Sequence, residues 1–292
     1  MKKCVYLSNP AIQAFTEWFA EELNQPKYPH AYLSARGRSY AFAGVADAMQ
    51  QYDWSFRFED GDGKLWEGHT LAENQSALDH LSHHLQQALA DGNDEATRVW
   101  CTTVMKWGGV MNGNAKWLAD NQAGLAAHVA GVKAILDMDD DAGQYLTPIH
   151  RFNAGMTKVY SLLCSSFIIY DSRVAAALAW FVVRWCQETG RYEVPELLAF
   201  PCLPPKQDKN ASLLKIRNPS VDGLRFPALV GAPKHAQWNL RASWVLDASL
   251  DKAKHADFGN NLRALEAALF MWGYDLGNRA GQRQVKAMEA AL

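Results

Sequence analysis

Apolar residues recur with the period of a helix along most of this chain. In residues 10–23, Ile12, Phe15, Phe19 and Leu23 fall on one helical face. The same period predicts further helices over residues 71–90, 94–107, 115–136, 155–164, 172–187, 235–254 and 260–274. The pattern therefore predicts a mainly α fold.

One short segment has the pattern of a β-hairpin instead. Residues 54–58 alternate between aromatic and polar side chains, and the turn sequence Asp60-Gly61-Asp62-Gly63 follows. Alternation that leads into a glycine-containing turn is typical of a hairpin. We therefore predict a small β-hairpin between residues 54 and 66, in the N-terminal third.

The length of the chain suits one large domain or two lobes that share a core. We expect residues 1–110 to form an N-terminal helical lobe with the hairpin, and residues 111–292 to form the second lobe of one continuous globule. Between residues 195 and 233 the chain is rich in proline and basic residues without a clear period, which predicts a long surface excursion.

The composition excludes several classes of protein. Hydrophobic residues make up 49% of the chain and charged residues 21%, a balance that argues against disorder. No apolar run reaches the roughly 18–20 residues of a membrane span, and the first residues do not resemble a signal peptide. The five cysteines are too scattered for a zinc knuckle or an iron–sulfur cluster. We therefore expect a soluble, cytoplasmic protein with reduced thiols and no membrane partner.

Charge is unevenly distributed, although the net charge is only −2. Residues 51–95 carry ten acidic side chains against two basic ones, whereas residues 204–241 carry seven basic side chains against two acidic ones. A basic segment of this kind attracts a phosphate backbone. The alternative is a solvated loop in a chain of mixed charge.

Lys158 and Asp171 are the first candidates for chemistry. A helix from Lys158 to Cys164 advances about 9 Å, and an extended return from Ser166 covers up to about 16 Å. A turn at Ser165-Ser166 would therefore bring Asp171 back to the level of Lys158, in a pocket walled by apolar helices. The alternatives are a lysine that carries its amine to solvent and an aspartate that only caps the next helix.

An amine beside a carboxylate suits the excision of a base from DNA. A lysine in an apolar wall can attack the sugar C1′ as a neutral amine, and the resulting Schiff base permits strand cleavage. The carboxylate would stabilise the oxocarbenium-like charge and assist proton transfer. The target base must leave the stack and enter a pocket of aromatic and apolar side chains.

The run Gly155-Met-Thr-Lys158-Val, followed by a helix and then Ile169-Tyr-Asp171-Ser-Arg173-Val, resembles the core of the helix–hairpin–helix DNA glycosylase superfamily. It is most similar to the 8-oxoguanine glycosylase-like branch. In that family a Gly-x-x-Lys-x element opens a helix and an aspartate caps the next one. The resemblance implies that Lys158 is the nucleophile and Asp171 the essential aspartate. It also implies a two-lobed fold, a partner duplex with one flipped base, and no metal or organic cofactor.

The sequence departs from the family at three points. The family hairpin Leu-Pro-Gly-x-Gly is replaced by Phe152-Asn-Ala-Gly155-Met, which keeps one glycine and no proline. The separation of Lys158 and Asp171 is shorter than is usual in the family. The four-cysteine cluster of the endonuclease III branch is absent.

Further candidates surround this core. His235 and Arg241 lie near a predicted helix start, and helix starts attract phosphates. Trp107 and Asn114 flank a glycine-rich turn that could present them to a base or a phosphate. For the turn, the alternative is an ordinary helix end followed by the cap of the next helix. The predicted DNA-binding residues are Gly155, Arg173, Lys215, Arg217, Lys234, His235 and Arg241, and the predicted base pocket contains Trp107, Asn114 and Trp238.

Two acidic or histidine-rich clusters have partial metal-site patterns. One comprises Asp79, His80, His83 and His84 at helical spacing, and the other comprises Asp137, Asp139, Asp140 and Asp141. We expect the first cluster to be polar surface and the second to be a solvated turn. A metal-dependent nuclease is therefore the last of the three functional hypotheses. The leading hypothesis is a DNA glycosylase, with or without AP-lyase activity, in DNA repair or anti-phage defence. The alternative is a catalytically inactive protein of the same fold that binds nucleic acid or another partner.

Overall fold

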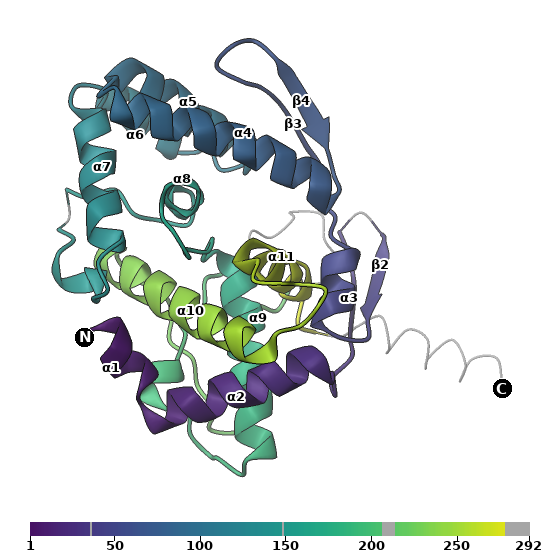
Figure 1. Cartoon of the computed structure of the whole chain (residues 1–292). Coiled ribbons are helices and arrows are strands. Elements are labelled where there is room, and N and C mark those ends of the chain that lie inside the picture. Colours follow the sequence, from purple (N-terminus) through teal and green to yellow (C-terminus); the bar gives the residue numbers. More distant parts are fainter. Residues whose placement is uncertain (36, 148, 206–213, 278–292) are drawn as a thin grey trace. The chain divides into compact units, whose positions relative to one another are not determined.

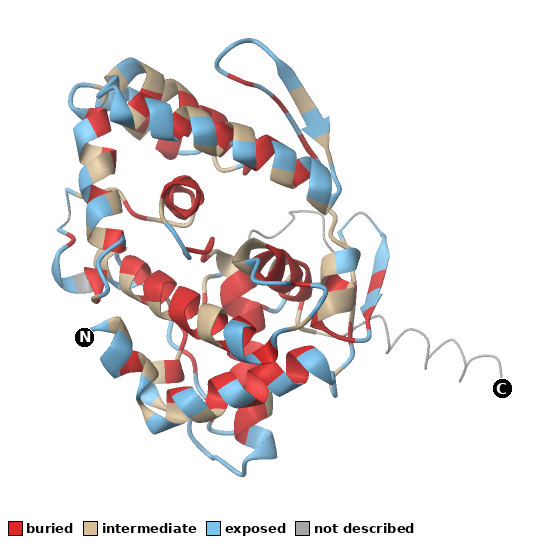
Figure 2. Cartoon of the chain, viewed as in Figure 1, coloured by how far each residue is buried: buried red, intermediate tan, exposed pale blue. Residues whose placement is uncertain are grey.

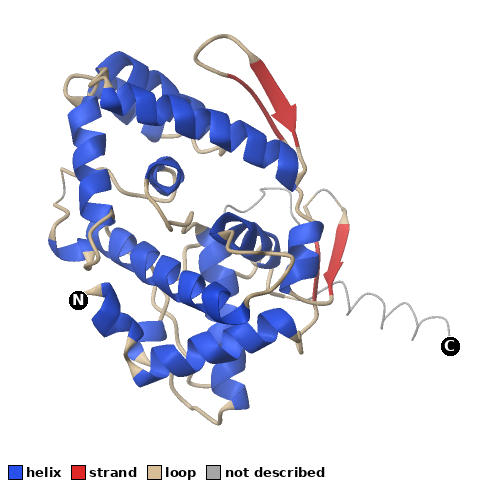
Figure 3. Ribbon diagram, viewed as in Figure 1, coloured by secondary structure: helices blue, strands red, loops and turns tan. Residues whose placement is uncertain are grey.

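The computed structural model of the protein describes residues 1–35, 37–147, 149–205 and 214–277. These residues form eleven α-helices and two separate two-stranded antiparallel hairpins, which confirms the predicted mainly α fold with a small β-hairpin (Figures 1 and 3). No described helix is both long and apolar enough to cross a membrane.

The chain divides into two compact units that do not follow the expected division at residue 110. The first contains Met1–Cys4, Tyr52–Ile169 and Val230–Ser243, and the second contains Val5–Gln51, Tyr170–Leu229 and Trp244–Leu292. Each unit is assembled from segments far apart in sequence. Helical periodicity reports only local structure, so it could not show which distant segments pack together.

In the first unit, helices α4 and α5 have the bounds predicted from the sequence, Leu71–Ala90 and Asp94–Trp107. Helix α4 begins at a capping box, in which Thr70 and Glu73 each bond to the other's backbone amide. Strands β3 (Phe56–Glu59) and β4 (Leu65–Gly68) form the predicted hairpin, with Phe58 opposite Trp66.

The predicted helix over residues 115–136 is wrong, because the chain forms two helices there. They are α6 (Asn114–Asp120) and α7 (Leu125–Leu136). Gly124 between them has a φ of 77°, a left-handed conformation that favours glycine and interrupts a helix. The carboxylate of Asp94 then accepts hydrogen bonds from the amides of Gly124 (2.7 Å) and Ala126 (2.9 Å), which starts α7.

Helix α8 (Met156–Leu163) is the most deeply enclosed helix of the first unit. All eight of its residues are buried, and it packs against α4 and α5. Its ribbon is red in Figure 2. Ser82 of α4 donates a 2.6 Å hydrogen bond to the carbonyl of Leu162. The chain turns at residues 165–166 as predicted, with Ser166 at a φ of 46°.

The second unit contains a hairpin and a helix that the sequence did not predict. Its remaining helices were expected within two residues of the observed ends. The elements within it are α2 (Pro10–Asn24), β1 (His30–Leu33), β2 (Ser39–Phe42), α3 (Val45–Gln50), α9 (Ser172–Glu188) and α11 (Leu262–Trp272). Two helices contribute residues to both units, namely α1 (Lys3–Leu7) and α10 (Ala232–Ala253).

Helices α9 and α11 pack closely where α11 ends. A Cβ atom placed on Gly273 would lie 1.9 Å from the carbonyl oxygen of Arg173 and 3.1 Å from the amide nitrogen of Ala177. Both are backbone atoms that cannot rotate away. Only glycine therefore fits at this contact.

The expected surface excursion over residues 195–233 is partly wrong. Residues 206–213, which include Lys206 and Lys209, lie outside the described residues. The remainder forms a short 3₁₀ helix (Glu196–Leu198) and a bridge between Cys202 and Ala228. Phe200 and Phe226 are buried, so this segment supplies part of the core despite its irregular backbone.

Candidate functional site

Lys158 lies in the first turn of α8 and is only 6% exposed. Its aliphatic stem passes over Gly108, because a Cβ atom placed on Gly108 would lie 2.5 Å from Cδ and 2.8 Å from Cε of Lys158. Lys158 is therefore a buried residue and not one of the exposed lysines of an amphipathic surface helix. Gly108 was not predicted from the sequence as a functional residue, although the glycine pair after Trp107 was a visible signal.

The loop before α8 is held by a network of amide side chains. Oδ1 of Asn153 accepts from the backbone amides of Gly155 (2.8 Å) and Met156 (3.0 Å). Oδ1 of Asn114 accepts from Nδ2 of Asn153 (2.9 Å) and Nη2 of Arg151 (3.1 Å). A Cβ atom on Gly155 would lie 2.1 Å from Nδ2 of Asn114. The two predicted site residues Gly155 and Asn114 are therefore in contact, and a phosphate at these amides would have to displace Asn153.

Asp171 caps α9, as predicted. Its Oδ1 accepts hydrogen bonds from the backbone amides of Arg173 (2.8 Å) and Val174 (3.2 Å). The amide groups at the start of a helix stabilise a negative charge. Lys158 belongs to the first unit and Asp171 to the second.

Three predicted DNA-binding residues gather around Tyr274, just beyond α11. The guanidinium of Arg173 lies 4.7 Å from the centre of the Tyr274 ring and 4.0 Å from that of Phe270. Nζ of Lys215 lies 5.0 Å from the Tyr274 ring centre, and the guanidinium of Arg217 lies 6.0 Å from it. The structure therefore brings together three cations from distant parts of the sequence, since Arg173 and Arg217 are 44 positions apart.

Arg217 is the most deeply buried of these cations, at 7% exposure. Its Nε donates to the carbonyl of Tyr274 (3.3 Å), and Nη1 donates to Oγ of Ser172. Burial and the positive charge of Arg173 lower the pKa of Arg217 to about 10, against the opposing effect of Asp171. The periodicity of the sequence gave no indication of this burial.

The candidates on α10 are less available to a ligand than the sequence suggested. Lys234 is exposed, but His235 is buried with its ring centre 5.3 Å from that of Phe152. Arg241 forms a 3.0 Å ion pair with Asp141 and lies over the ring of Trp238 at 4.8 Å.

Trp107 is also buried, and its indole nitrogen donates a 2.9 Å hydrogen bond to Oδ1 of Asn74. It therefore fills the core between α4 and α5. As a base-contacting residue it stays a prediction.

The two partial metal patterns are used in other ways. His80 bonds to Oδ2 of Asp60 at 2.9 Å, and the ring of His84 stacks on Trp100 at 4.1 Å. Asp140 pairs with the amino group of Met1 at 2.9 Å. Within the described ranges, no group of three or more His, Cys, Asp or Glu side chains is arranged to hold a metal ion.

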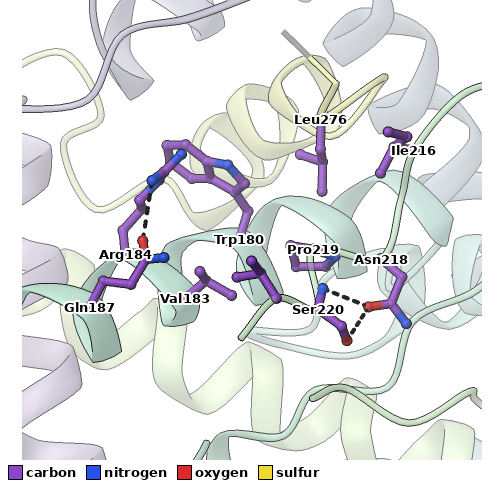
Figure 4. A pocket seen from close by; sticks show the side chains of 10 residues that line it. Trp180, Val183, Arg184, Gln187, Ile216, Asn218, Pro219, Ser220 and Leu276 are labelled. Carbon is purple, nitrogen blue, oxygen red and sulfur yellow. Dashed lines mark hydrogen bonds between the residues drawn. The ribbon is translucent and has the colours of Figure 1, made fainter. Parts of the chain in front are cut away.

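A pocket of about 300 Å³ lies in the second unit, between α9 and the segment that follows residue 215 (Figure 4). The guanidinium of Arg184 lies 4.6 Å from the ring centre of Trp180, and its Nη1 donates to Oε1 of Gln187 at 3.2 Å. The sequence reasoning missed this pocket, although Trp180 and Arg184 are spaced to share one face of a helix. It is lined by Trp180, Val183, Arg184, Gln187, Ile216, Asn218, Pro219, Ser220, Val221 and Leu276.

No protein family model matches the sequence, and neither the curated proteins nor the solved structures contain a significant match. The resemblance of residues 151–178 to the helix–hairpin–helix glycosylases therefore stays a prediction from those residues.

Proposed function

We propose that this protein is a DNA glycosylase that excises a damaged or modified base, with Lys158 as the nucleophile and Asp171 as the supporting carboxylate. The observation that carries the proposal is the burial of Lys158 in the first turn of an enclosed helix. Lysine is among the residues least often buried, and catalytic lysines that form Schiff bases depend on such burial.

The surroundings of Asp171 also support the proposal. Its carboxylate is fixed at the start of α9 by two backbone amides, and the cations of Arg173, Lys215 and Arg217 lie at the same end of that helix. A fixed carboxylate stabilises positive charge on the sugar, while cations beside it hold the DNA backbone.

The proposed reaction proceeds at the sugar C1′. The amine of Lys158 forms a bond to C1′ as the bond from C1′ to the base breaks, and the departing base takes up the proton that Asp171 relays from the attacking nitrogen. Asp171 stabilises the oxocarbenium-like charge and accepts the proton that the attacking nitrogen loses. Opening of the sugar gives a Schiff base, from which the 3′ phosphate can be eliminated. Without attack by Lys158, water takes the place of the amine and the strand is not cut.

The test is borohydride trapping of the purified protein on duplexes that carry different damaged and modified bases. Lys158→Gln and Asp171→Asn are compared with Lys116→Gln, which removes an exposed lysine of α6 paired with Asp120. We expect a covalent adduct that is lost in Lys158→Gln, impaired excision in Asp171→Asn, and normal behaviour in Lys116→Gln. Free base without an adduct would indicate a monofunctional enzyme and remove Lys158 from its role.

A second candidate function is nucleic-acid or partner binding without catalysis. In the glycosylase family, the glycine amides of the hairpin bind a phosphate. Here the amides of Gly155 and Met156 donate to Asn153 instead, which favours a protein that has departed from the family's activity. DNA binding that survives Lys158→Gln, without adduct or released base on any substrate, would support this reading.

A further inference from the structure

A buried arginine without a carboxylate partner distinguishes the start of α9. The nearby carboxylates of Asp171 and Asp275 influence Arg217 at a distance, but the described part of the chain contains no ion pair to it. Asp171 instead accepts from two amides of α9, and Asp275 accepts from the amides of Ile216 (2.9 Å) and Gly277 (3.1 Å). The charge of Arg217 is therefore desolvated without being neutralised by a direct contact.

Such an arrangement is costly for a protein that binds nothing there. Taking a cation out of water is unfavourable, and an ion pair normally offsets part of that cost. Here Arg173 adds a second positive charge that lowers the pKa of Arg217 further. Charged groups with strongly perturbed pKa values cluster at functional sites, where a ligand of opposite sign can supply the missing partner.

The hydrogen-bonding capacity of Arg217 points to the same conclusion. A guanidinium has five N–H donors. Its hydrogen bonds to the carbonyl of Tyr274 and the hydroxyl of Ser172 use two of them. The other donors meet no acceptor among the described residues. A planar guanidinium with free donors matches the oxygens of a phosphate group.

Two further cations and a helix start complete the arrangement. Arg173 and Lys215 lie over the same Tyr274 ring as Arg217, and Ser172 begins a helix of 17 residues. Among the described residues, Asp171 and Asp275 are the carboxylates that act on Arg217. The positive end of the helix dipole adds to the positive potential at the start of α9. Arg173 is held against Phe270 and Tyr274, so it loses little further freedom when it binds.

We propose that Arg173, Lys215 and Arg217 form a binding site for one phosphate group at the start of α9. The identification of that group as a phosphodiester of the DNA strand rests on the proposed function. The site itself depends only on the second unit.

The first experiment measures binding of inorganic phosphate by the broadening of its ³¹P resonance. The full-length protein is compared with Arg217→Gln, Arg217→Lys and Lys215→Met. The control is Arg191→Gln, an exposed arginine that also lies over an aromatic ring, Trp185, at 4.5 Å. We expect broadening with the unaltered protein and Arg191→Gln, loss with Arg217→Gln, and partial retention with Arg217→Lys. If Arg217→Gln unfolds, weakened broadening with Lys215→Met carries the test.

The second experiment tests DNA as the source of the phosphate. Duplexes with a tetrahydrofuran abasic analogue carry one neutral methylphosphonate, moved stepwise along the strand. We expect one position at which the substitution weakens binding about tenfold to a hundredfold, as for the loss of one charge-assisted contact. The methylphosphonate and Arg217→Gln remove the same contact, so the penalty at that position should disappear in Arg217→Gln. It should persist in Arg191→Gln, which leaves the contact in place.

The outcomes separate this site from the proposed glycosylase. Equal phosphate broadening in the unaltered protein and in both Arg217→Gln and Lys215→Met would overturn the site, even if base excision were observed. Phosphate binding that depends on Arg217, without excision on any duplex, would support the site and count against the glycosylase. Dependence on Arg217 for inorganic phosphate but not for methylphosphonate duplexes would assign the site to a small phosphate ester.

Discussion

Gly108 provides the sharpest test of the role assigned to Lys158. Its φ of −77° and ψ of −5° are open to any residue, so the backbone does not require glycine there. The space does, because an added Cβ would lie 2.5 Å from Cδ of Lys158. Ordinary carbon–carbon contacts begin at about 3.5 Å. In Gly108→Ala the lysine stem must therefore move by about 1 Å, which a flexible side chain can do without unfolding the protein.

The expected consequence is a loss of chemistry with little loss of stability. A misplacement of about 1 Å in a reacting group can cost about a hundredfold in rate. We therefore expect Gly108→Ala to form the borohydride-trapped adduct about a hundredfold more slowly under single-turnover conditions. The free energy of unfolding should change by less than about 1 kcal/mol, because alanine restricts the unfolded chain while the lysine shifts.

Gly131→Ala is the matched control, since a Cβ atom on this α7 glycine would meet nothing within 4 Å. It should form the adduct at the unaltered rate and gain up to about 1 kcal/mol in stability. Equal trapping rates for Gly108→Ala and the unaltered protein would refute the reasoning. An equal loss of trapping rate in Gly108→Ala and Gly131→Ala would also refute it.

Three further predictions concern stability. Gly273→Ala should destabilise the protein by about 3 kcal/mol or more in urea unfolding, because its Cβ would collide with the backbone of Arg173; an unchanged midpoint would contradict the close approach. Burial lowers the pKa of His30 to about 4, so the unfolded chain takes up a proton between pH 6.5 and 4 while the folded chain does not. The unfolding free energy should therefore fall by about 2 kcal/mol more between pH 7 and pH 5 in the unaltered protein than in His30→Phe; equal slopes would count against this burial. Asp141→Ala should cost about 3 kcal/mol, because it removes the ion pair of Arg241, whose side chain is only 11% exposed. The double variant with Arg241→Met should recover part of that loss, and a larger loss in the double variant would show that the pair is not coupled.

Many helix starts could be predicted because their signals act over a few residues. The capping box of Thr70 and Glu73 and the capping carboxylate of Asp171 both bond to amides within four positions of themselves. The hairpin at residues 56–68 similarly depends on a local turn. Where a local signal was overlooked, as at Gly124, the predicted helix over residues 115–136 was wrong.

The candidate site was only partly open to such reasoning. The sequence identified Lys158, Asp171, Arg173, Lys215 and Arg217 by residue type and resemblance. It could not show that the stem of Lys158 lies on Gly108, or that Arg217 is buried while Arg241 pairs with Asp141. These contacts join residues up to 100 positions apart.

The sequence by itself therefore determined the mainly α class, most helix ends and the identity of the candidate groups. Only the tertiary structure decided how the chain divides into units, which cations gather at α9, and that Arg217 has no ion pair among the described residues. The physical reason is that a sequence pattern reports interactions between residues close together along the chain. Caps and periodicity reflect bonds along one element, whereas burial and pairing depend on which distant elements meet.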